Sequence, residues 1–176
     1  MIRILIWIFM LVGGSAAGIW LDTVLFKSWI MNPWLHVIGF IIGLIMLRSV
    51  INCSRNTGRL LASLGREGNL PRLQTNKLVT EGYYACMRHP MHFGLLLFPW
   101  AIAFIVGSLS FILIIAPLEM LTMIIMIKLV EEPQTVKKFG DEYHRYCDQV
   151  PMFSFRPICL KQLFGKSGPI EKLESN

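Results

Sequence analysis

The chain has 176 residues and a formal net charge of +6, with 17 Lys and Arg residues against 11 Asp and Glu residues. Hydrophobic residues make up 54% of it and charged residues only 16%, whereas a soluble domain usually has about 25% charged residues. This composition excludes an ordinary soluble domain, and with it the nucleic-acid partner that a basic soluble chain would suggest. It indicates an integral membrane protein.

The first apolar segment, Ile4–Trp20, is nearly free of charge and is long enough to cross a bilayer, which needs about 20 apolar residues. We interpret it as a retained transmembrane helix. The alternative is a cleaved signal peptide, because Arg3 precedes the apolar core and the small residues of "GGSAAG" follow it.

A second apolar segment, Trp34–Ile51, follows a short connection flanked by tryptophans. Both segments contain a Gly-x-x-x-Gly pair, Gly14 with Gly18 and Gly39 with Gly43, a spacing that lets helices approach closely in lipid. The repetition of this pair in adjacent segments predicts that the two helices form a first hairpin. The same glycines would also serve in a homo-oligomer.

Two further apolar segments, Met91–Val106 and Phe111–Val130, are separated only by the turn sequence "GSLS", so we expect a second hairpin. Most of the basic residues lie in the middle loop and the tail, while the hairpin turns contain only Asp22 and Lys27. Because cytoplasmic loops of membrane proteins are enriched in Lys and Arg, both termini and the middle loop are predicted to be cytoplasmic. In a prokaryote this would be the cell inner membrane.

The predicted fold is therefore an all-α integral membrane protein with about four transmembrane helices in two hairpins. It is a single membrane domain, residues 1–176. Its parts are an N-terminal transmembrane hairpin (1–52), a cytoplasmic loop (53–90), a second transmembrane hairpin (91–130) and a cytoplasmic tail (131–176).

The polar residues on the predicted cytoplasmic side are concentrated in two blocks. In "EGYYACMRHPMHFG", Pro90 suits the first turn of a helix, which places Arg88 and His89 at an end that attracts anions. Arg88 alone would equally serve as a headgroup anchor. Glu131 and Glu132 follow the fourth apolar segment, at a helix end whose dipole disfavours carboxylates, so we expect a compensating cation from a ligand, Arg88 or Lys128.

Other polar residues allow more than one interpretation. Glu119 lies inside the fourth apolar segment. It can be interpreted as a functional group, as part of a helix–helix contact or as a residue at the outer membrane interface. Lys128 is expected to extend to the membrane surface. "FGDEYHRYCDQVP" predicts one amphipathic helix with Phe139, Tyr143 and Tyr146 on a face. The four cysteines show no CxxC spacing and are read as free thiols, and the His residues do not form a metal site.

The two blocks together resemble the family of isoprenylcysteine carboxyl methyltransferases and phospholipid methyltransferases, which are integral membrane enzymes. The resemblance runs from about Leu64 to Pro157. The matching residues are Leu78, Val79, Gly82, Tyr84, Arg88, His89, Pro90, Gly94, Glu131, Glu132, Phe139, Gly140, Glu142, Tyr143, Tyr146, Val150 and Pro151. The departures include His92 where the family usually has Tyr and Lys128 near where many members have Arg.

The resemblance implies an S-adenosylmethionine-dependent methyltransferase whose loop, second hairpin and tail form a cofactor pocket. It assigns cofactor binding to Tyr84, His89, Pro90, Gly94, Glu131, Glu132 and Tyr143, with Glu132 above all at the cationic amino end of the methionine moiety. The acceptor would be a lipophilic or small molecule that enters from the membrane lipids, such as the carboxylate of a prenylcysteine-like compound.

Methyl transfer proceeds by in-line attack on an activated methyl group, so the protein mainly supplies position and electrostatics. A carboxylate acceptor requires only a cation, for which Arg88, Lys128 or Arg156 is suited. An amine or thiol acceptor requires a base, for which His89 or His92 is suited. Two alternatives remain at this point, a membrane reductase that uses NADPH and a non-catalytic membrane protein.

Overall fold

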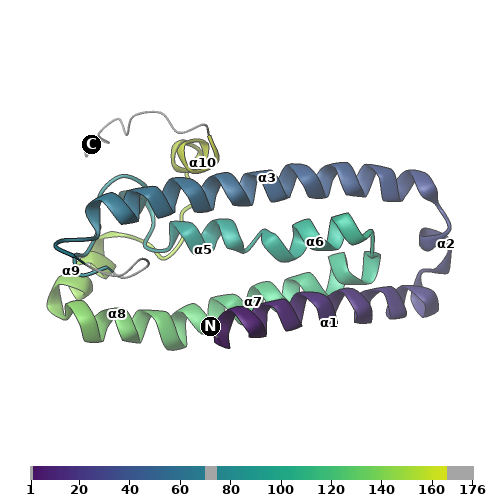
Figure 1. Cartoon of the computed structure of the whole chain (residues 1–176), viewed down its shortest axis with the longest axis horizontal. Helices are drawn as coiled ribbons and strands as arrows, with labels where there is room; N and C mark the ends of the chain where they lie inside the picture. The colour runs from purple at the N-terminus through teal and green to yellow at the C-terminus, as the bar shows by residue number, and fades with distance from the viewer. Residues whose placement is uncertain (1, 70–74, 166–176) are drawn as a thin grey trace. The chain divides into compact units, whose positions relative to one another are not determined.

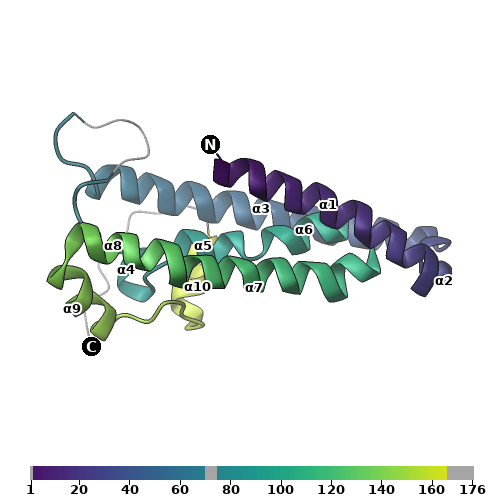
Figure 2. The same ribbon diagram turned by 90° about the horizontal axis from the view of Figure 1, so that it is seen from below.

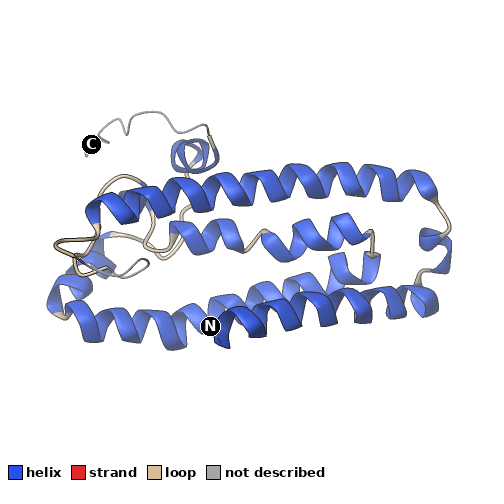
Figure 3. Ribbon diagram, in the orientation of Figure 1, coloured by secondary structure: helices blue, strands red, loops and turns tan. Residues whose placement is uncertain are grey.

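The computed structural model describes residues 2–69 and 75–165, and within these residues every regular element is a helix (Figure 3). Three helical stretches are long and apolar enough to cross a membrane, Leu5–Leu25, Pro33–Leu64 and Phe111–Phe139. The predicted all-α membrane fold is thereby confirmed. The chain divides into two compact units: unit 1 comprises residues 1–48 and 96–127, and unit 2 comprises residues 49–95 and 128–176.

Unit 1 is built from apolar helices (Figure 1). They are α1 (Ile2–Leu25), the short α2 (Lys27–Ile30), the first part of α3 (Pro33–Leu64), α6 (Phe98–Val106), the π-helical turn η1 (Phe111–Ile115) and α7 (Ala116–Met126). Its core centres on Ala103, Phe111, Ile112 and Ala116. Large apolar side chains such as Phe9, Val12 and Leu118 are exposed on the surfaces of these helices, as expected for lipid-facing residues.

The glycine pairs allow close helix contacts, but not the contacts that we expected. A Cβ atom added at Gly18 would lie 2.7 Å from Ser108 Oγ, and one at Gly43 would lie 2.8 Å from the carbonyl oxygen of Ala101. The first pair therefore packs against η1 and α7 and the second against α6. The prediction that the two pairs join α1 to α3 was wrong, because glycine spacing shows that a helix can be approached closely but not by which partner.

The turn between α6 and η1 confirms the tight turn predicted at "GSLS". Gly107 ends α6 in the left-handed conformation (φ 74°), where an L side chain is strained. Its carbonyl oxygen accepts a hydrogen bond from Trp29 Nε1 (3.1 Å), and the Asp22 carboxylate accepts one from the backbone N–H of Ser110 (2.7 Å). The sequence placed Asp22 in the turn of the first hairpin. It is instead buried in α1, and its carboxylate caps the start of η1.

The third apolar segment does not form one long helix. It consists of α5 (Pro90–Leu95) and α6, with a turn at residues 96–97 just before Pro99. Proline lacks an N–H, and its ring collides with the carbonyl group four residues earlier, so a regular helix cannot continue through it. The stretch from Pro90 to Val106 is correspondingly shorter than the three candidate spans.

Unit 2 contains shorter helices joined by polar loops (Figure 2). They are the end of α3, α4 (Tyr83–Cys86), α5, the π-helical turn η2 (Ile127–Glu131), which begins at the boundary of the unit, α8 (Glu132–Phe139), α9 (Asp141–Gln149) and α10 (Pro157–Phe164). Its core is formed by Cys53, Met87, Cys159 and Leu163. Asn56 of α3 donates hydrogen bonds to the carbonyl oxygens of Leu163 and Gly165 (both 3.2 Å) and so holds the end of α10.

A disulfide joins Cys86 of α4 to Cys159 of α10, with their Cα atoms 6.0 Å apart. The prediction of free thiols was wrong for this pair and is confirmed for Cys53 and Cys147. The two bonded residues are separated by 73 positions in the sequence, so only the packing of α10 against α4 brings them together.

Candidate functional site

A half-open cavity of about 230 Å³ lies within unit 2. This volume is just below the ~300–1,000 Å³ of typical small-molecule sites. The residues that line it come from the end of α3, the segment 75–79, α4, the residues just ahead of α5, α5 itself, the last residue of η2, α8 and α9. They are Leu61, Thr75, Lys77, Leu78, Val79, Tyr84, Arg88, His89, Pro90, Met91, His92, Glu131, Thr135, Phe139, Tyr143 and Tyr146. The tertiary fold therefore brings both polar blocks of the sequence to one place.

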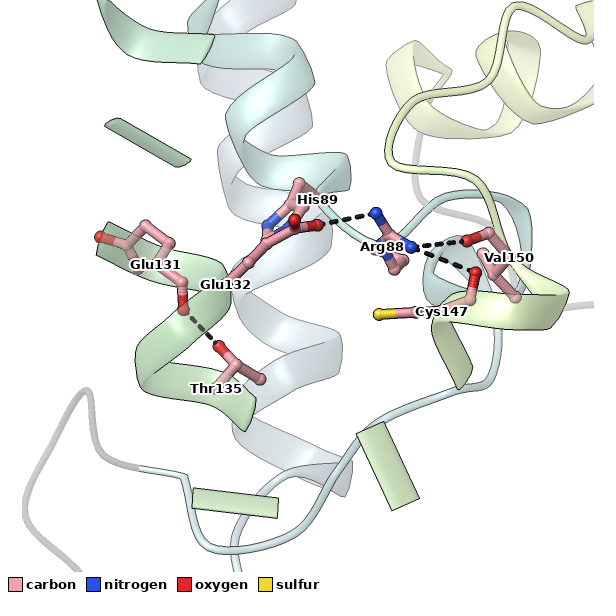
Figure 4. A network of polar contacts seen from close by, with 7 residues as sticks. All are labelled: Arg88, His89, Glu131, Glu132, Thr135, Cys147 and Val150. Carbon is pink, nitrogen blue, oxygen red and sulfur yellow. Dashed lines mark hydrogen bonds and ion pairs between the residues drawn. The ribbon is translucent and has the colours of Figure 1, made fainter. Parts of the chain in front are cut away.

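Arg88 connects three segments of this site (Figure 4). Its guanidinium group donates hydrogen bonds to Glu132 Oε1 (2.7 Å) and to the carbonyl oxygens of Cys147 (3.2 Å) and Val150 (3.4 Å). The side chains of Arg88 and Glu132 are 14% and 21% exposed, so their ion pair is shielded from most of the solvent. The Arg88 side chain thus holds α8 and the end of α9 in fixed positions beside the cavity.

The backbone just ahead of α5 makes the same connection. The N–H groups of Arg88 and His89 donate to the carbonyl oxygens of Pro151 (3.0 Å) and Met152 (3.3 Å). Pro90 then begins α5, as its fixed φ and missing N–H predicted. These contacts explain why an Arg-His-Pro sequence and a distant Val-Pro sequence occur together, because their backbones are paired.

His89 is neutral at physiological pH. Burial, the neighbouring His92 ring and Arg88 lower the pKa of His89 to about 4, and Glu132 only partly opposes them. Nε2 of His89 lies 3.4 Å from Glu132 Oε1. Since an ionised carboxylate only accepts hydrogen bonds, Nε2 carries the ring proton and Nδ1 is left with a lone pair.

The glutamate pair is not at a helix end. The helix that contains Glu131 and Glu132 continues through η2 and α8 to Phe139, so the helix-dipole argument made from the sequence was wrong. The expected compensating cation is present nevertheless, because Arg88 pairs with Glu132. The Glu131 side chain points away from this pair, and Glu131, not Glu132, lines the cavity (Figure 4).

Three tyrosines form the aromatic side of the cavity. Tyr143 and Tyr146 lie on α9, are 2% and 6% exposed, and have ring centroids 6.0 Å apart. The hydroxyl group of Tyr146 donates to the carbonyl oxygen of Tyr84, which fixes α9 against α4. Burial raises the pKa of Tyr84 to about 12. The predicted single amphipathic helix is interrupted at Gly140 (φ 55°), so Phe139 ends α8 instead of sharing a helix with the tyrosines.

The phospholipid methyltransferase family model matches residues 31–142, which is more than half of the chain. The chain belongs to the phospholipid methyltransferase family. No curated protein and no solved structure matches it. The resemblance drawn from its motifs is thereby confirmed at the level of the family, and the protein is a membrane methyltransferase.

The cavity of this methyltransferase contains buried polar atoms that fit a bound polar ligand. Within the described residues, Arg88 Nε and the Tyr143 hydroxyl group are buried without a hydrogen-bond partner. Burial raises the pKa of Tyr143 and the nearby Cys147 thiol raises it further, but a thiol is a weak partner and no well-oriented bond forms. Because unsatisfied buried donors cost free energy, a ligand with acceptor atoms would stabilise this site.

The other residues assigned to the site from the sequence are divided by the structure. His92 lines the cavity, with its ring centroid 5.6 Å from that of His89. Gly94 is buried against Cys53 and does not line the cavity, and Lys128 is exposed and does not line it either. The structure adds Lys77 and Thr135, and their only signal in the sequence was a position near the two motif blocks.

Glu119 is 4% exposed in unit 1, and its carboxylate packs on Gly14, where an added Cβ atom would lie 2.8 Å from Oε1. Glu119 therefore lies in a helix–helix contact, which is one of the readings left open by the sequence. Among the described residues, no group of three or more His, Cys, Asp and Glu side chains is arranged to hold a metal ion.

Proposed function

We propose that this methyltransferase uses S-adenosylmethionine and methylates a lipophilic acceptor at the membrane surface. The observation that carries the proposal is the cavity itself, which gathers the Arg-His-Pro block, Glu131 and the aromatic residues of a methyltransferase family member. The cofactor, when bound, supplies a methyl group activated by a sulfonium centre. We also propose that the cavity faces the cytoplasm, as the distribution of Lys and Arg suggests.

The residues of the cavity suit the parts of such a cofactor. Aromatic faces attract cations, so Tyr84, Tyr143 and Phe139 would stabilise a sulfonium. Glu131 would attract the ammonium group of the methionine moiety, because Glu131 lines the cavity and Glu132 does not. The unpartnered Tyr143 hydroxyl group and Arg88 Nε would donate to ligand oxygen or nitrogen atoms.

Arg88 is better described as a positioning residue than as a catalytic one. Its charge is engaged by Glu132 and by two carbonyl oxygens, so it does not offer a free cation to an acceptor. His89 is a poor general base, because a group with a pKa of about 4 binds a proton only weakly at neutral pH. A carboxylate acceptor, which needs no base, therefore fits the site better than an amine.

A phospholipid amine is the second candidate acceptor, since the matching family is named for phospholipid methylation. In this case His92, which also lines the cavity, would be the base. The two acceptors are distinguished by the stability of the product to alkali. With a labelled methyl donor, alkali releases the methyl group of a methyl ester as methanol, whereas an N-methyl group stays bound to its nitrogen and yields no methanol.

The test of the proposal begins with calorimetric binding of S-adenosylhomocysteine to the purified protein in detergent. We expect saturable binding that weakens at least about tenfold in Tyr143→Phe and in Glu131→Gln, because each loses a polar contact with the ligand. Glu142→Gln, a change at an exposed residue of α9 outside this cavity, is the matched control. A folded protein that binds no S-adenosylhomocysteine would exclude the proposed cofactor, and NADPH would be tested next.

A further inference from the structure

The cationic side chains of the cavity differ in how far their charges are compensated. Arg88 is bonded to Glu132 Oε1 at 2.7 Å and to the carbonyl oxygens of Cys147 and Val150. His89 is neutral. Lys77 lines the same cavity, and its ammonium group makes no ion pair or hydrogen bond with the residues that the structure describes. Lys77 is thus the uncompensated cation at this cavity.

The backbone that carries Lys77 is held in place by several hydrogen bonds. The N–H groups of Asn76 and Lys77 both donate to the carbonyl oxygen of Gly65 (3.0 and 3.3 Å). The Asn76 side chain exchanges two further bonds with the backbone of Glu67 (both 2.8 Å). Lys138 of α8 donates to the carbonyl oxygen of Thr75. A cation on this segment is therefore positioned, in contrast to a lysine on an unsupported loop.

Gly65 makes this close approach possible. A Cβ atom at Gly65 would lie 2.7 Å from the carbonyl oxygen of Leu61 and 3.2 Å from methyl groups of Thr75 and Val79. Val79 is buried and lines the cavity, so the contact also sets the position of the cavity wall. The sequence Leu-Gly-Arg at residues 64–66 thus has a structural reason, because glycine at its centre lets the Lys77 segment pack on the end of α3.

We infer that Lys77 is the anion-binding residue of the cavity and that its ligand is the carboxylate of a bound small molecule. The inference rests on the proposed function and adds a residue that its sequence motifs do not include. Two molecules carry a suitable carboxylate, the cofactor in its methionine moiety and a carboxylate acceptor. The ammonium group of lysine is a compact charge that suits either of them.

The experiment compares Lys77→Met with the wild-type protein in binding two ligands, S-adenosylhomocysteine and its derivative that lacks the carboxylate. Lys137→Met is the matched control, because Lys137 is an exposed lysine of α8 that does not line the cavity. Lys77→Arg, which keeps the charge, tests for rescue. Lys77 is exposed at the surface, so its replacement is not expected to prevent folding.

If Lys77 holds the cofactor carboxylate, Lys77→Met weakens S-adenosylhomocysteine binding about tenfold and leaves binding of the derivative unchanged. If it holds the acceptor, S-adenosylhomocysteine binding is unchanged while the KM of the acceptor identified by the alkali test rises at constant kcat. Either result supports the inference, and Lys77→Arg should recover most of the loss.

Unchanged binding of S-adenosylhomocysteine together with an unchanged acceptor KM in Lys77→Met would overturn the role of Lys77 alone. Absence of S-adenosylhomocysteine binding by the folded wild-type protein would overturn the proposed cofactor, and the role of Lys77 with it. The two failures are therefore distinguished by the wild-type measurement.

Discussion

The two units of this methyltransferase are stabilised by different means. In unit 1, helices approach closely because Gly18 and Gly43 have no side chains, and their contacts are with the side chain of Ser108 and the backbone of Ala101. In unit 2, Arg88 and other polar side chains bond to backbone carbonyl groups of distant segments. Glycines thus allow the close helix contacts of unit 1, where Asp22 and Trp29 add hydrogen bonds at one end, whereas side-chain hydrogen bonds to distant backbone groups hold the segments of unit 2 together.

This difference predicts which kind of substitution should destabilise each unit. A methyl group added at a helix contact disrupts unit 1, whereas loss of a single donor disrupts unit 2. The difference also explains why the cavity lies in unit 2. A membrane-spanning helix tolerates few unpaired polar groups, whereas a binding site requires several. The four predictions below test the distinction, from the largest expected effect to the smallest.

The largest effect is expected for Arg88→Ala. It leaves Glu132 partly buried without its cation and removes the bonds to Cys147 and Val150. We expect a loss of about 2–4 kcal/mol of stability, less than for a fully buried pair because both side chains are partly exposed. Thermal unfolding in detergent should show a midpoint lowered by roughly 5–10 °C. An unchanged midpoint would contradict the role of Arg88 in linking the three segments.

The disulfide between Cys86 and Cys159 joins two helices of unit 2, closes a long loop of the chain and should stabilise the protein by about 2–4 kcal/mol. Unfolded protein purified without reductant should therefore expose two thiols, from Cys53 and Cys147, and four after reduction. Cys159→Ser should lower the unfolding midpoint, while Cys147→Ser should not. Four thiols before reduction would contradict the disulfide between Cys86 and Cys159.

His89 makes the stability of unit 2 depend on pH. Its pKa is about 4 in the folded protein and about 6.5 when unfolded, so below pH 6.5 the unfolded chain binds the proton first. Stability should therefore be constant above pH 6.5 and fall by up to about 3 kcal/mol as the pH approaches 4. Unfolding midpoints of wild type and His89→Gln between pH 7.5 and 4.5 test this, and equal slopes would exclude His89 as the cause.

The smallest effect is expected at the helix contact in unit 1. A Cβ atom at Gly18 would lie 2.8 Å from Phe111 Cβ, so Gly18→Ala should cost about 1–3 kcal/mol. Gly13→Ala in the same helix meets nothing within 4 Å and should be neutral or slightly stabilising. Binding of S-adenosylhomocysteine by the folded fraction should remain unchanged in both variants. Equal midpoints for the two variants would contradict the close packing of α1.

Several features followed directly from the sequence. Apolar length predicted the three helices that are long enough to cross a membrane, Pro90 predicted the start of α5, and the sequence "GSLS" predicted the turn at Gly107. The ordered motif blocks predicted the family, and most of the residues that line the cavity belong to these blocks. These features depend on the local conformation of a few residues or on short sequence patterns. Both can be recognised in one sequence.

Only the tertiary structure decided which of these elements meet. Three kinds of contact join residues that are far apart in the chain. They are the contacts of the glycine pairs, the disulfide between Cys86 and Cys159, and the ion pair of Arg88 with Glu132. The same is true of Lys77, which is unremarkable in the sequence and lines the cavity because Gly65 lets its segment pack closely. Long-range contacts are selected by shape and by hydrogen-bond geometry, and neither can be read from spacing along the chain.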